Sequence, residues 1–389
     1  MNHRLIFAIL ASLLISTTIV SYAFFSVDPP KDEPQGLYLG IDVAYENMTE
    51  IKNLVDKVSP YTNLFIIGCT GITNVYNINR TARHFSENFT LLNEACQYIS
   101  DKGLNFIVFR DTPIFNSSWP DAARKTWGNH FLGYYAFDEI GGYQLDLHEY
   151  KFVDRADNYS DAATTFVKTA NRYLNRFMMF RNITQFKLYT SDYGLYWFDY
   201  QAGYDTVFAQ FGWNYSRQLN IAQCRGAATM HGKDWGAIIT WTYTKPPYLE
   251  SGEDLYKDMV LAYENGAKYI ILFDSNEGWT QSVLEPEHLD ALRNFWEYAK
   301  ANPRETTQEV DRVAYVLPQD YGYGFRGPND KIWGLWQADD FTGTVCSNLS
   351  NLLAQYGERL DIVYEDGLSG NGTCGYSRLV FWNGTVRTP

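Results

Sequence analysis

Short apolar runs alternate with amphipathic segments along most of the chain. Eight of these runs have the length of a strand, and they span residues 37–43, 64–69, 106–110, 132–137, 186–190, 206–211, 236–242 and 269–274. The segments between them, such as "MTEIKNLVDKV" and "EDLYKDMVLAYENGAK", repeat apolar residues at the i, i+3, i+4 and i+7 spacing of an amphipathic helix. The pattern therefore predicts repeated strand and helix units.

Repeated units of this kind predict an α/β fold in which crossover helices join parallel strands. Eight units are the number at which such a sheet closes into a (β/α)8 TIM barrel. An open, doubly wound sheet is the alternative, and a nucleotide function for it would need a glycine-rich phosphate loop after the first strand. The stretch "LGIDVAYENMT" holds no such motif. The weakest unit is the fifth, because "YGLYWFDYQAGY" is a poor helix sequence.

The pattern restarts near Arg304. The segments "RVAYVLP", "CSNLSNLLAQYGERL", "DIVYED" and "SRLVFWNG" predict a strand, a helix and two further strands. The glycine- and aromatic-rich segment "QDYGYGFRGPNDKIWGLW" between the first two predicts a long loop. We therefore expect a barrel over residues 36–303 and a small C-terminal α/β appendage over residues 304–389.

The N-terminus carries a basic residue, Arg4, followed by an uncharged run that continues to Asp28. This run is long enough to span a bilayer, while Ser21 and Ala23 resemble a signal-peptidase site. The sequence predicts either a signal peptide or an N-terminal membrane anchor over residues 1–27, followed by a linker over residues 28–35. Either one predicts an extracellular or cell-surface location.

Two further features are typical of an exported protein. Acceptor sites of the N-x-[ST] type occur at Asn47, Asn79, Asn88, Asn116, Asn158, Asn182, Asn214, Asn348, Asn371 and Asn383. The five cysteines show no metal-binding or redox spacing. We expect a disulfide between Cys346 and Cys374, and we expect Cys224, within a predicted helix, to be a buried free thiol.

Composition narrows the class of ligand. The formal net charge of −13 argues against a nucleic-acid surface, which would need clustered basic residues. Aromatic residues make up 17% of the chain, and such rings stack well on sugar faces. The six histidines are scattered without HxH or HExxH spacing, so no metal and no other cofactor is predicted. A carbohydrate is the expected partner, with the membrane as a second one if the N-terminal segment is uncleaved.

The functional residues of such barrels lie on the loops after the carboxyl ends of the strands. Carboxylates and aromatic rings gather at these positions in the sequence. The residues predicted there as substrate ligands are Asp42, Arg110, Asp111, Tyr135, Asp192, Trp213, Trp241, Tyr243 and Glu277. Polar residues at strand ends also cap helices, which is the alternative role for Asp111 and Asp192.

The stretch "GYYAFDEIGG" at the end of the fourth strand gives the sharpest chemical signal, because Asp138 and Glu139 follow an aromatic run. Aromatic surroundings desolvate a carboxyl group and keep it protonated to higher pH, as a general acid requires. Cleavage of a glycosidic bond also needs a second, ionised carboxylate. Asp274 is the first candidate for it, with a helix cap or an ion pair as its alternative role, and Asp42 and Asp192 come next.

The stretches "LGYYAFDEIGG", "GAIITWTY" and "YIILFDSN" together resemble the superfamily of (β/α)8 glycoside hydrolases over residues 36–303. The appended domain is similar to the α/β domain that follows the barrel in β-galactosidase-like members. The resemblance implies an acid/base role for Glu139 and an aromatic ligand at Trp241. Two departures stand out: the family's fourth-strand Glu usually follows Asn rather than Asp, and its nucleophile, a Glu after the seventh strand, has no counterpart before Glu250.

Two functions from different classes are therefore expected. One is a glycoside hydrolase with Glu139 as the acid, which the converging carboxylates favour. The other is a catalytically silent glycan-binding or structural surface protein, which the missing seventh-strand Glu favours. For the enzyme, a partner carboxylate on the opposite strand, Asp274, predicts inversion, and one on the adjacent strand, Asp192, predicts retention.

Export makes a prediction about the protein isolated from its own cells. Enzymatic removal of N-linked glycans should lower its apparent mass substantially on electrophoresis, because the acceptor sites are dense. A cytosolic location combined with an unchanged mass would contradict export.

Overall fold

The computed structural model describes residues 32–45, 47–73, 76–78, 85–87, 89–110, 118–146, 151–181, 185–304, 311–369 and 375–388. The chain divides into two compact units, Met1–Pro34 and Gln35–Pro389, and the second unit holds every element named below. The predicted signal peptide or anchor lies outside the described residues. Within the described part of the chain, no helix has the length and apolar character needed to cross a bilayer.

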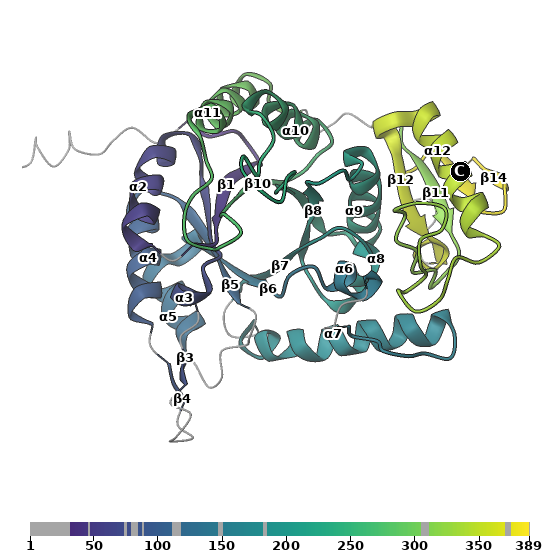
Figure 1. The fold of residues 1–389 in the computed structure, drawn as a ribbon, viewed down its shortest axis with the longest axis horizontal. Helices are drawn as coiled ribbons and strands as arrows, with labels where there is room; N and C mark the ends of the chain where they lie inside the picture. The colour runs from purple at the N-terminus through teal and green to yellow at the C-terminus, as the bar shows by residue number, and fades with distance from the viewer. Residues whose placement is uncertain are drawn as a thin grey trace, which may run out of the picture. The chain divides into compact units, whose positions relative to one another are not determined.

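Eight parallel strands form a closed barrel in the order β1-β10-β9-β8-β7-β6-β5-β2 (Figure 1). They are β1 Tyr38–Val43, β2 Leu64–Ile67, β5 Asn105–Arg110, β6 Phe131–Ala136, β7 Lys187–Asp192, β8 Thr206–Phe211, β9 Asp234–Ile239 and β10 Tyr269–Asp274. The predicted TIM barrel is thereby confirmed, and the open sheet is excluded. The fourth and eighth barrel strands, β6 and β10, lie opposite each other in the ring.

Helices surround the barrel and connect its strands (Figure 1). They are α2 Met48–Val58, α4 Thr90–Asp101, α5 Trp119–Trp127, α7 Tyr159–Arg181, α8 Tyr196–Ala202, α9 Arg217–His231, α10 Gly252–Glu264 and α11 Pro286–Ala301, with the short α3 Thr70–Thr73 and α6 Ile140–Leu145 and the 3-10 turns η1 Ser59–Tyr61 and η2 Gly128–His130. The poor helix sequence of the fifth unit forms only the short α8. An antiparallel hairpin that the pattern did not predict, β3 Tyr76–Ile78 with β4 Phe85–Glu87, follows α3.

Alternate positions along the strands fill the barrel interior. The buried inward-facing set is Leu64, Ile66, Ile107, Tyr135, Tyr189, Phe208, Ile238, Tyr269 and Ile271. The positions between them face the helices. Because side chains alternate along a strand, the same parity directs Asp42, Ser191 and Gln210 inward at the carboxyl ends of β1, β7 and β8.

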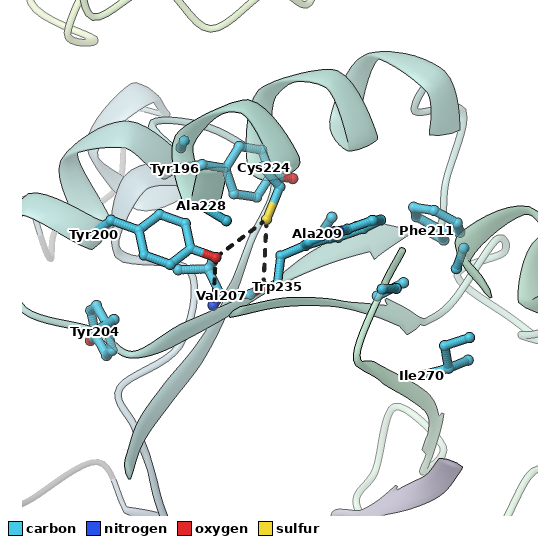
Figure 2. Close-up of a cluster of buried hydrophobic side chains, with 14 of the residues drawn as sticks. Tyr196, Tyr200, Tyr204, Val207, Ala209, Phe211, Cys224, Ala228, Trp235 and Ile270 are labelled. Carbon is cyan, nitrogen blue, oxygen red and sulfur yellow. Dashed lines mark hydrogen bonds between the residues drawn. The ribbon is translucent and has the colours of Figure 1, made fainter. Parts of the chain in front are cut away.

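Aromatic residues pack densely between β8 and the helices α8 and α9 (Figure 2). Cys224 of α9 lies within this layer, and its thiol donates to the Val207 carbonyl oxygen at 3.4 Å. The Tyr200 hydroxyl lies 4.0 Å from the same sulfur and accepts a bond from the Val207 amide at 3.2 Å. Cys224 is buried and free, which confirms the prediction for this residue.

The other modification predictions fare differently. Cys346 is a free cysteine and Cys374 lies outside the described residues, so the predicted disulfide is not supported. Among the acceptor asparagines, Asn47, Asn158, Asn214 and Asn383 are exposed and Asn348 is half-buried. The remaining acceptors lie outside the described residues, and they are Asn79, Asn88, Asn116, Asn182 and Asn371.

A separate four-stranded sheet forms the C-terminal domain, in the order β12-β11-β13-β14. Its elements are β11 Val313–Leu317, α12 Thr342–Tyr356, η3 Gly357–Arg359, β12 Leu360–Tyr364, η4 Glu365–Ser369, β13 Arg378–Phe381 and β14 Val386–Arg387. The first three strands are parallel, whereas β14 is antiparallel to β13. The predicted order of strand, helix, strand and strand is found.

A buried ion pair joins the barrel to this domain. Arg225 of α9 donates from Nε to Oδ1 of Asp361 in β12 at 2.7 Å, and both side chains are fully enclosed. Arg225 also donates to Asn265 at 2.5 Å, while the Tyr376 hydroxyl donates to Asp361 Oδ2 at 2.9 Å. A Cβ atom on the neighbouring Gly226 would lie 2.3 Å from the Ile362 carbonyl oxygen, so the two elements approach closely.

This pair makes a prediction about stability. Asp361→Asn should lower the free energy of unfolding by about 3 kcal/mol, because it leaves the Arg225 charge buried without its counter-charge. Asp311→Asn is the matched control, since it breaks an exposed pair with Arg359 at 3.5 Å and should cost less than about 0.5 kcal/mol. Urea denaturation measures both variants. Equal losses would show that the buried pair contributes no more than a surface one.

Candidate active site

The chain turns sharply where β6 ends. Phe137 and Glu139 have positive φ angles of 60° and 53°, in the left-handed region that non-glycine residues rarely adopt. The Glu139 amide donates to the Ser191 carbonyl oxygen at 3.0 Å, and the Thr190 hydroxyl donates to the Phe137 carbonyl oxygen at 2.9 Å. These bonds hold a conformation that interrupts the alternation of side chains along the strand. As a result, Asp138 and Glu139 both contact inward-facing polar residues at the carboxyl end of the barrel.

Asp138 contacts inward-facing residues of two strands. Its Oδ1 accepts the Tyr135 hydroxyl of β6 at 2.5 Å and the Ser191 hydroxyl of β7 at 2.8 Å. Burial raises the pKa of Asp138, while these two bonds and the Glu139 amide oppose the rise. Each donor stabilises the ionised carboxylate more than the neutral acid.

Glu139 joins the same cluster through Gln210 of β8. The Gln210 Nε2 donates to Glu139 Oε1 at 2.5 Å and to Ser191 Oγ at 3.2 Å. Burial, followed by the charge of Asp138, raises the pKa of Glu139 to about 8. Glu139 is therefore mainly protonated at neutral pH. We call Asp138 and Glu139 the acidic pair. In this pair, Glu139 is the proton donor, and Asp138 is the carboxylate whose ionised form is stabilised by hydrogen bonds.

Asp192, at the end of β7, binds backbone amides. Its carboxylate accepts the N–H groups of Gly141 at 2.6 Å, Gly142 at 2.8 Å, Tyr193 at 2.8 Å and Gly194 at 3.2 Å. The side chain is fully buried, and burial raises its pKa to about 7 against these bonds. Since two of the donors belong to α6, Asp192 holds the segment that follows the acidic pair. Its contacts are those of a positioning residue.

Asp274, the first sequence candidate for the second carboxylate, binds the loop after its own strand. Its Oδ1 accepts the Ser282 hydroxyl at 3.0 Å and the Val283 amide at 2.8 Å. Asp274 follows Phe273, whose ring packs against the inward-facing set, so strand alternation directs Asp274 outward. Burial raises the pKa of Asp274 to about 6. These contacts favour Asp138 over Asp274 as the partner of Glu139.

Asp42 of β1 lines a pocket of about 410 Å³ together with Asp138. Its side chain is 5% exposed, and its Oδ1 has no hydrogen-bond partner among the described residues. A Cβ atom on Gly68 would lie 2.3 Å from this oxygen, so glycine leaves the room that the carboxylate occupies. Burial, followed by the charges of Asp138 and Asp274, raises the pKa of Asp42 well above its usual range.

Aromatic side chains form one wall of this end of the barrel. The Trp241 indole donates to the Ser275 carbonyl oxygen at 2.8 Å, and its ring centroid lies 5.9 Å from Phe273 and 5.8 Å from Trp279. Phe273 and Trp279 line the pocket, and Trp279 is 51% exposed. Trp213 extends this wall at 6.5 Å from Trp241.

Other predicted ligands lie apart from the pocket. Tyr243 is 51% exposed and Glu277 is exposed, and neither lines it. Arg110 is buried and donates to the Thr73 carbonyl oxygen at 2.5 Å, at the end of α3. Asp111 lies outside the described residues.

The sequence interpretation missed several residues of the site. Ser191 and Gln210 join the two carboxylates, and Tyr143 lines the pocket and hydrogen-bonds Glu139. Tyr193 and Tyr215 stack with ring centroids 5.5 Å apart. The inward parity of the strands was the available signal for Ser191 and Gln210, because a polar residue at an inward position of a barrel strand needs a partner.

The long loop between β11 and α12 supports α6 from the C-terminal domain. The Gln144 side chain donates to the Trp333 carbonyl oxygen at 2.9 Å. Arg326 pairs with Asp146, whose other oxygen accepts the Tyr193 hydroxyl at 2.7 Å. Residues distant in sequence therefore brace the short helix that begins after the acidic pair.

A larger cavity, of about 640 Å³, lies at the amino ends of the strands and is lined by Tyr38, Lys187, Lys268 and Tyr269 among others. Both lysines donate to Asp234, at 2.7 Å and 2.9 Å. Its described lining includes no carboxylate, in contrast to the pocket at the opposite end of the barrel, which Asp42 and Asp138 line.

The seventh barrel strand, β9, is followed by Thr240 and Trp241, as the sequence indicated. The next carboxylate, Glu250, accepts a bond from Arg217 Nη2 at 3.1 Å and so joins the loop to α9. No group of three or more His, Cys, Asp or Glu residues in the described part of the chain could hold a metal ion.

The sequence matches no protein-family model and no curated protein. Solved structures do match. A β-galactosidase from the psychrophilic Marinomonas ef1 aligns with a TM-score of 0.55 and 10% identity over 89% of this chain and 72% of that one. A β-galactosidase from the Antarctic haloarchaeon Halorubrum lacusprofundi aligns with a TM-score of 0.56 and 11% identity over 89% and 69%. A cold-adapted β-galactosidase from Rahnella sp. R3 aligns with a TM-score of 0.55 and 10% identity over 90% of this chain and 68% of that one.

This chain shares its fold with β-galactosidases. The likeness extends past the barrel into the C-terminal domain, since it covers about nine tenths of the chain. The resemblance expected from the sequence is thus confirmed for the fold.

The raised pKa of Glu139 makes a prediction about folding. The folded protein holds this proton with a pKa of about 8 against an ordinary value of 4.5. The contribution of this proton to the free energy of unfolding is therefore complete below pH 4.5 and is lost as the pH rises through about 8. Glu139→Gln removes the titration, so the fall in the free energy of unfolding with pH should become shallower by up to about 1.4 kcal/mol per pH unit.

Urea denaturation across this pH range measures the effect. Glu277→Gln is the matched control, because it makes the same substitution at an exposed carboxylate. An identical pH dependence in the wild type and Glu139→Gln would contradict a buried, protonated Glu139.

Proposed function

We propose that this protein is a glycoside hydrolase in which Glu139 donates a proton and Asp138 acts as the ionised partner. The observation that carries the proposal is the acidic pair itself, directed to the carboxyl end of the barrel. The shared fold with β-galactosidases supports a carbohydrate substrate. The aromatic wall formed by Trp241, Phe273 and Trp279 offers ring faces on which a sugar would stack.

In the proposed reaction, the Glu139 carboxyl group gives its proton to the glycosidic oxygen as the bond from that oxygen to C1 breaks. The bonding electrons leave with the oxygen, so positive charge develops on C1 and the ring oxygen. The Asp138 carboxylate stabilises this charge. Water supplies the oxygen that finally bonds to C1, and a water proton restores the neutral Glu139.

Export is part of the proposal. The uncharged N-terminal run and the dense acceptor sites support an extracellular or cell-surface location, either as a secreted protein or as one anchored by residues 1–27. The exposed positions of Asn47, Asn158, Asn214 and Asn383 are accessible to a glycosyltransferase.

The second candidate is a catalytically silent glycan-binding or structural surface protein. The absence of a carboxylate directly after β9, where β-galactosidase-like members are expected to carry a nucleophile, favours it. The acidic pair weighs against it, because holding two adjacent carboxyl groups half-buried costs stability that a purely structural surface would have no reason to bear.

Substitution of the acidic pair tests the proposal on the intact protein. Glu139→Gln and Asp138→Asn should each lower the rate of hydrolysis by about 10²–10⁴-fold with little change in sugar binding, because each removes proton transfer or charge but little contact area. Glu277→Gln is the control and should retain full activity. The assay releases reducing ends from a panel of glycosides. Undiminished turnover in Glu139→Gln would disprove the assignment, and sugar binding without turnover in the wild type would establish the silent protein.

A further inference from the structure

Two carboxyl groups line the pocket beside the acidic pair, and its described lining holds no basic residue. Asp42 and Asp138 both line its 410 Å³, and no Lys, Arg or His occurs among its described lining residues. Arg110, the nearest strand-end cation that the sequence suggested, instead donates to the Thr73 carbonyl oxygen. Among the residues that the structure describes around this pocket, no Lys, Arg or His balances these carboxylates.

One oxygen of Asp42 also finds no partner in the described part of the chain. The Asp42 side chain is only 5% exposed, and its Oδ1 has no hydrogen-bond partner among the described residues. A buried oxygen of this kind costs stability unless something binds it. A Cβ atom at residue 68 would lie 2.3 Å from that oxygen, so only glycine at this position lets the carboxylate lie against the pocket wall. A donor supplied by the ligand would satisfy Asp42.

The rest of the pocket suits a sugar that carries positive charge. Phe109, Phe273 and Trp279 line it with aromatic rings, and Tyr143 adds a hydroxyl-bearing ring. Such faces stack on the apolar side of a pyranose and attract a cation through their quadrupole. A metal ion would fit less well, because hard cations need six or more oxygen ligands rather than two carboxylates among aromatic rings.

We propose that this pocket binds an amino sugar with a free ammonium group, held by the Asp42 carboxylate near Asp138. The proposal rests on the hydrolase function and names its substrate class. In a 2-amino-2-deoxyhexose the nitrogen is attached to the carbon next to C1. An ammonium at Asp42 therefore places the reacting carbon beside Asp138, the member of the acidic pair that lines the pocket.

N-acetylation provides a test that leaves the protein unchanged. Oligosaccharides of glucosamine and of galactosamine are compared with their N-acetylated forms and with the corresponding glucose and galactose oligomers. Calorimetry on Glu139→Gln measures binding without turnover. The free-amine forms should bind about 10- to 100-fold more tightly than either neutral form, as expected for a hydrogen bond to a buried charge.

Asp42→Asn provides the second arm. It keeps the shape of the side chain but removes its charge, so the preference for free amines should disappear while neutral sugars bind as before. Glu277→Gln, at an exposed carboxylate of the same end, should keep the preference. A general effect of net charge would instead lower amine binding equally in both variants.

The outcomes separate this proposal from the one it rests on. Equal binding and cleavage of neutral and free-amine sugars would overturn the amino-sugar proposal and leave the hydrolase intact. A preference for free amines that survives Asp42→Asn would overturn the role of Asp42. Failure to bind or cleave any sugar of the panel would overturn the hydrolase function and this proposal with it.

Discussion

The carboxylate of Asp192 is the contact on which the geometry of the candidate active site depends. Four backbone amides converge on it, and two of them belong to the first residues of α6. The amides of a helix N-terminus have no partner within the helix, so this buried acceptor satisfies them. It also compensates for the left-handed conformations at Phe137 and Glu139, which cost about 1 kcal/mol or more each. The sharp turn persists because the next strand holds both of its ends.

Hydrogen bonds, rather than ion pairs, determine which carboxyl group of the site is ionised. The acidic groups lie close together, Asp42 buried and Asp138 and Glu139 half-buried, and removal from water raises the pKa of each of them. Asp138 alone accepts two side-chain hydroxyl bonds, from Tyr135 and Ser191. Within the acidic pair, the negative charge is therefore best accommodated on Asp138 and the proton on Glu139.

Periodicity predicted the fold well because the barrel repeats one strand and helix unit. Its strands are buried on both faces, however, so a run such as "YIILFD" carries no alternation that shows which residues face inward. For this reason the sequence could place Asp274 and Asp42 at strand ends but could not tell that Asp274 faces outward and Asp42 inward. The adjacent pair Asp138 and Glu139 was recognisable, whereas the left-handed turn that brings both to the interior depends on bonds from β7.

The C-terminal domain belongs to the support of the site as well as to the fold. Its long loop contacts α6 through Trp333 and Arg326, and the Asp146 carboxylate joins Arg326 to Tyr193, the residue after Asp192. The buried pair of Arg225 and Asp361 fixes the same domain to α9, the helix that follows α8 and β8 in the chain. A helix of six residues has too few internal bonds to be stable alone. Two contacts thus maintain the orientation of the acidic pair. Asp192 binds the first amides of α6, and a loop almost two hundred residues later in the chain binds its side chains.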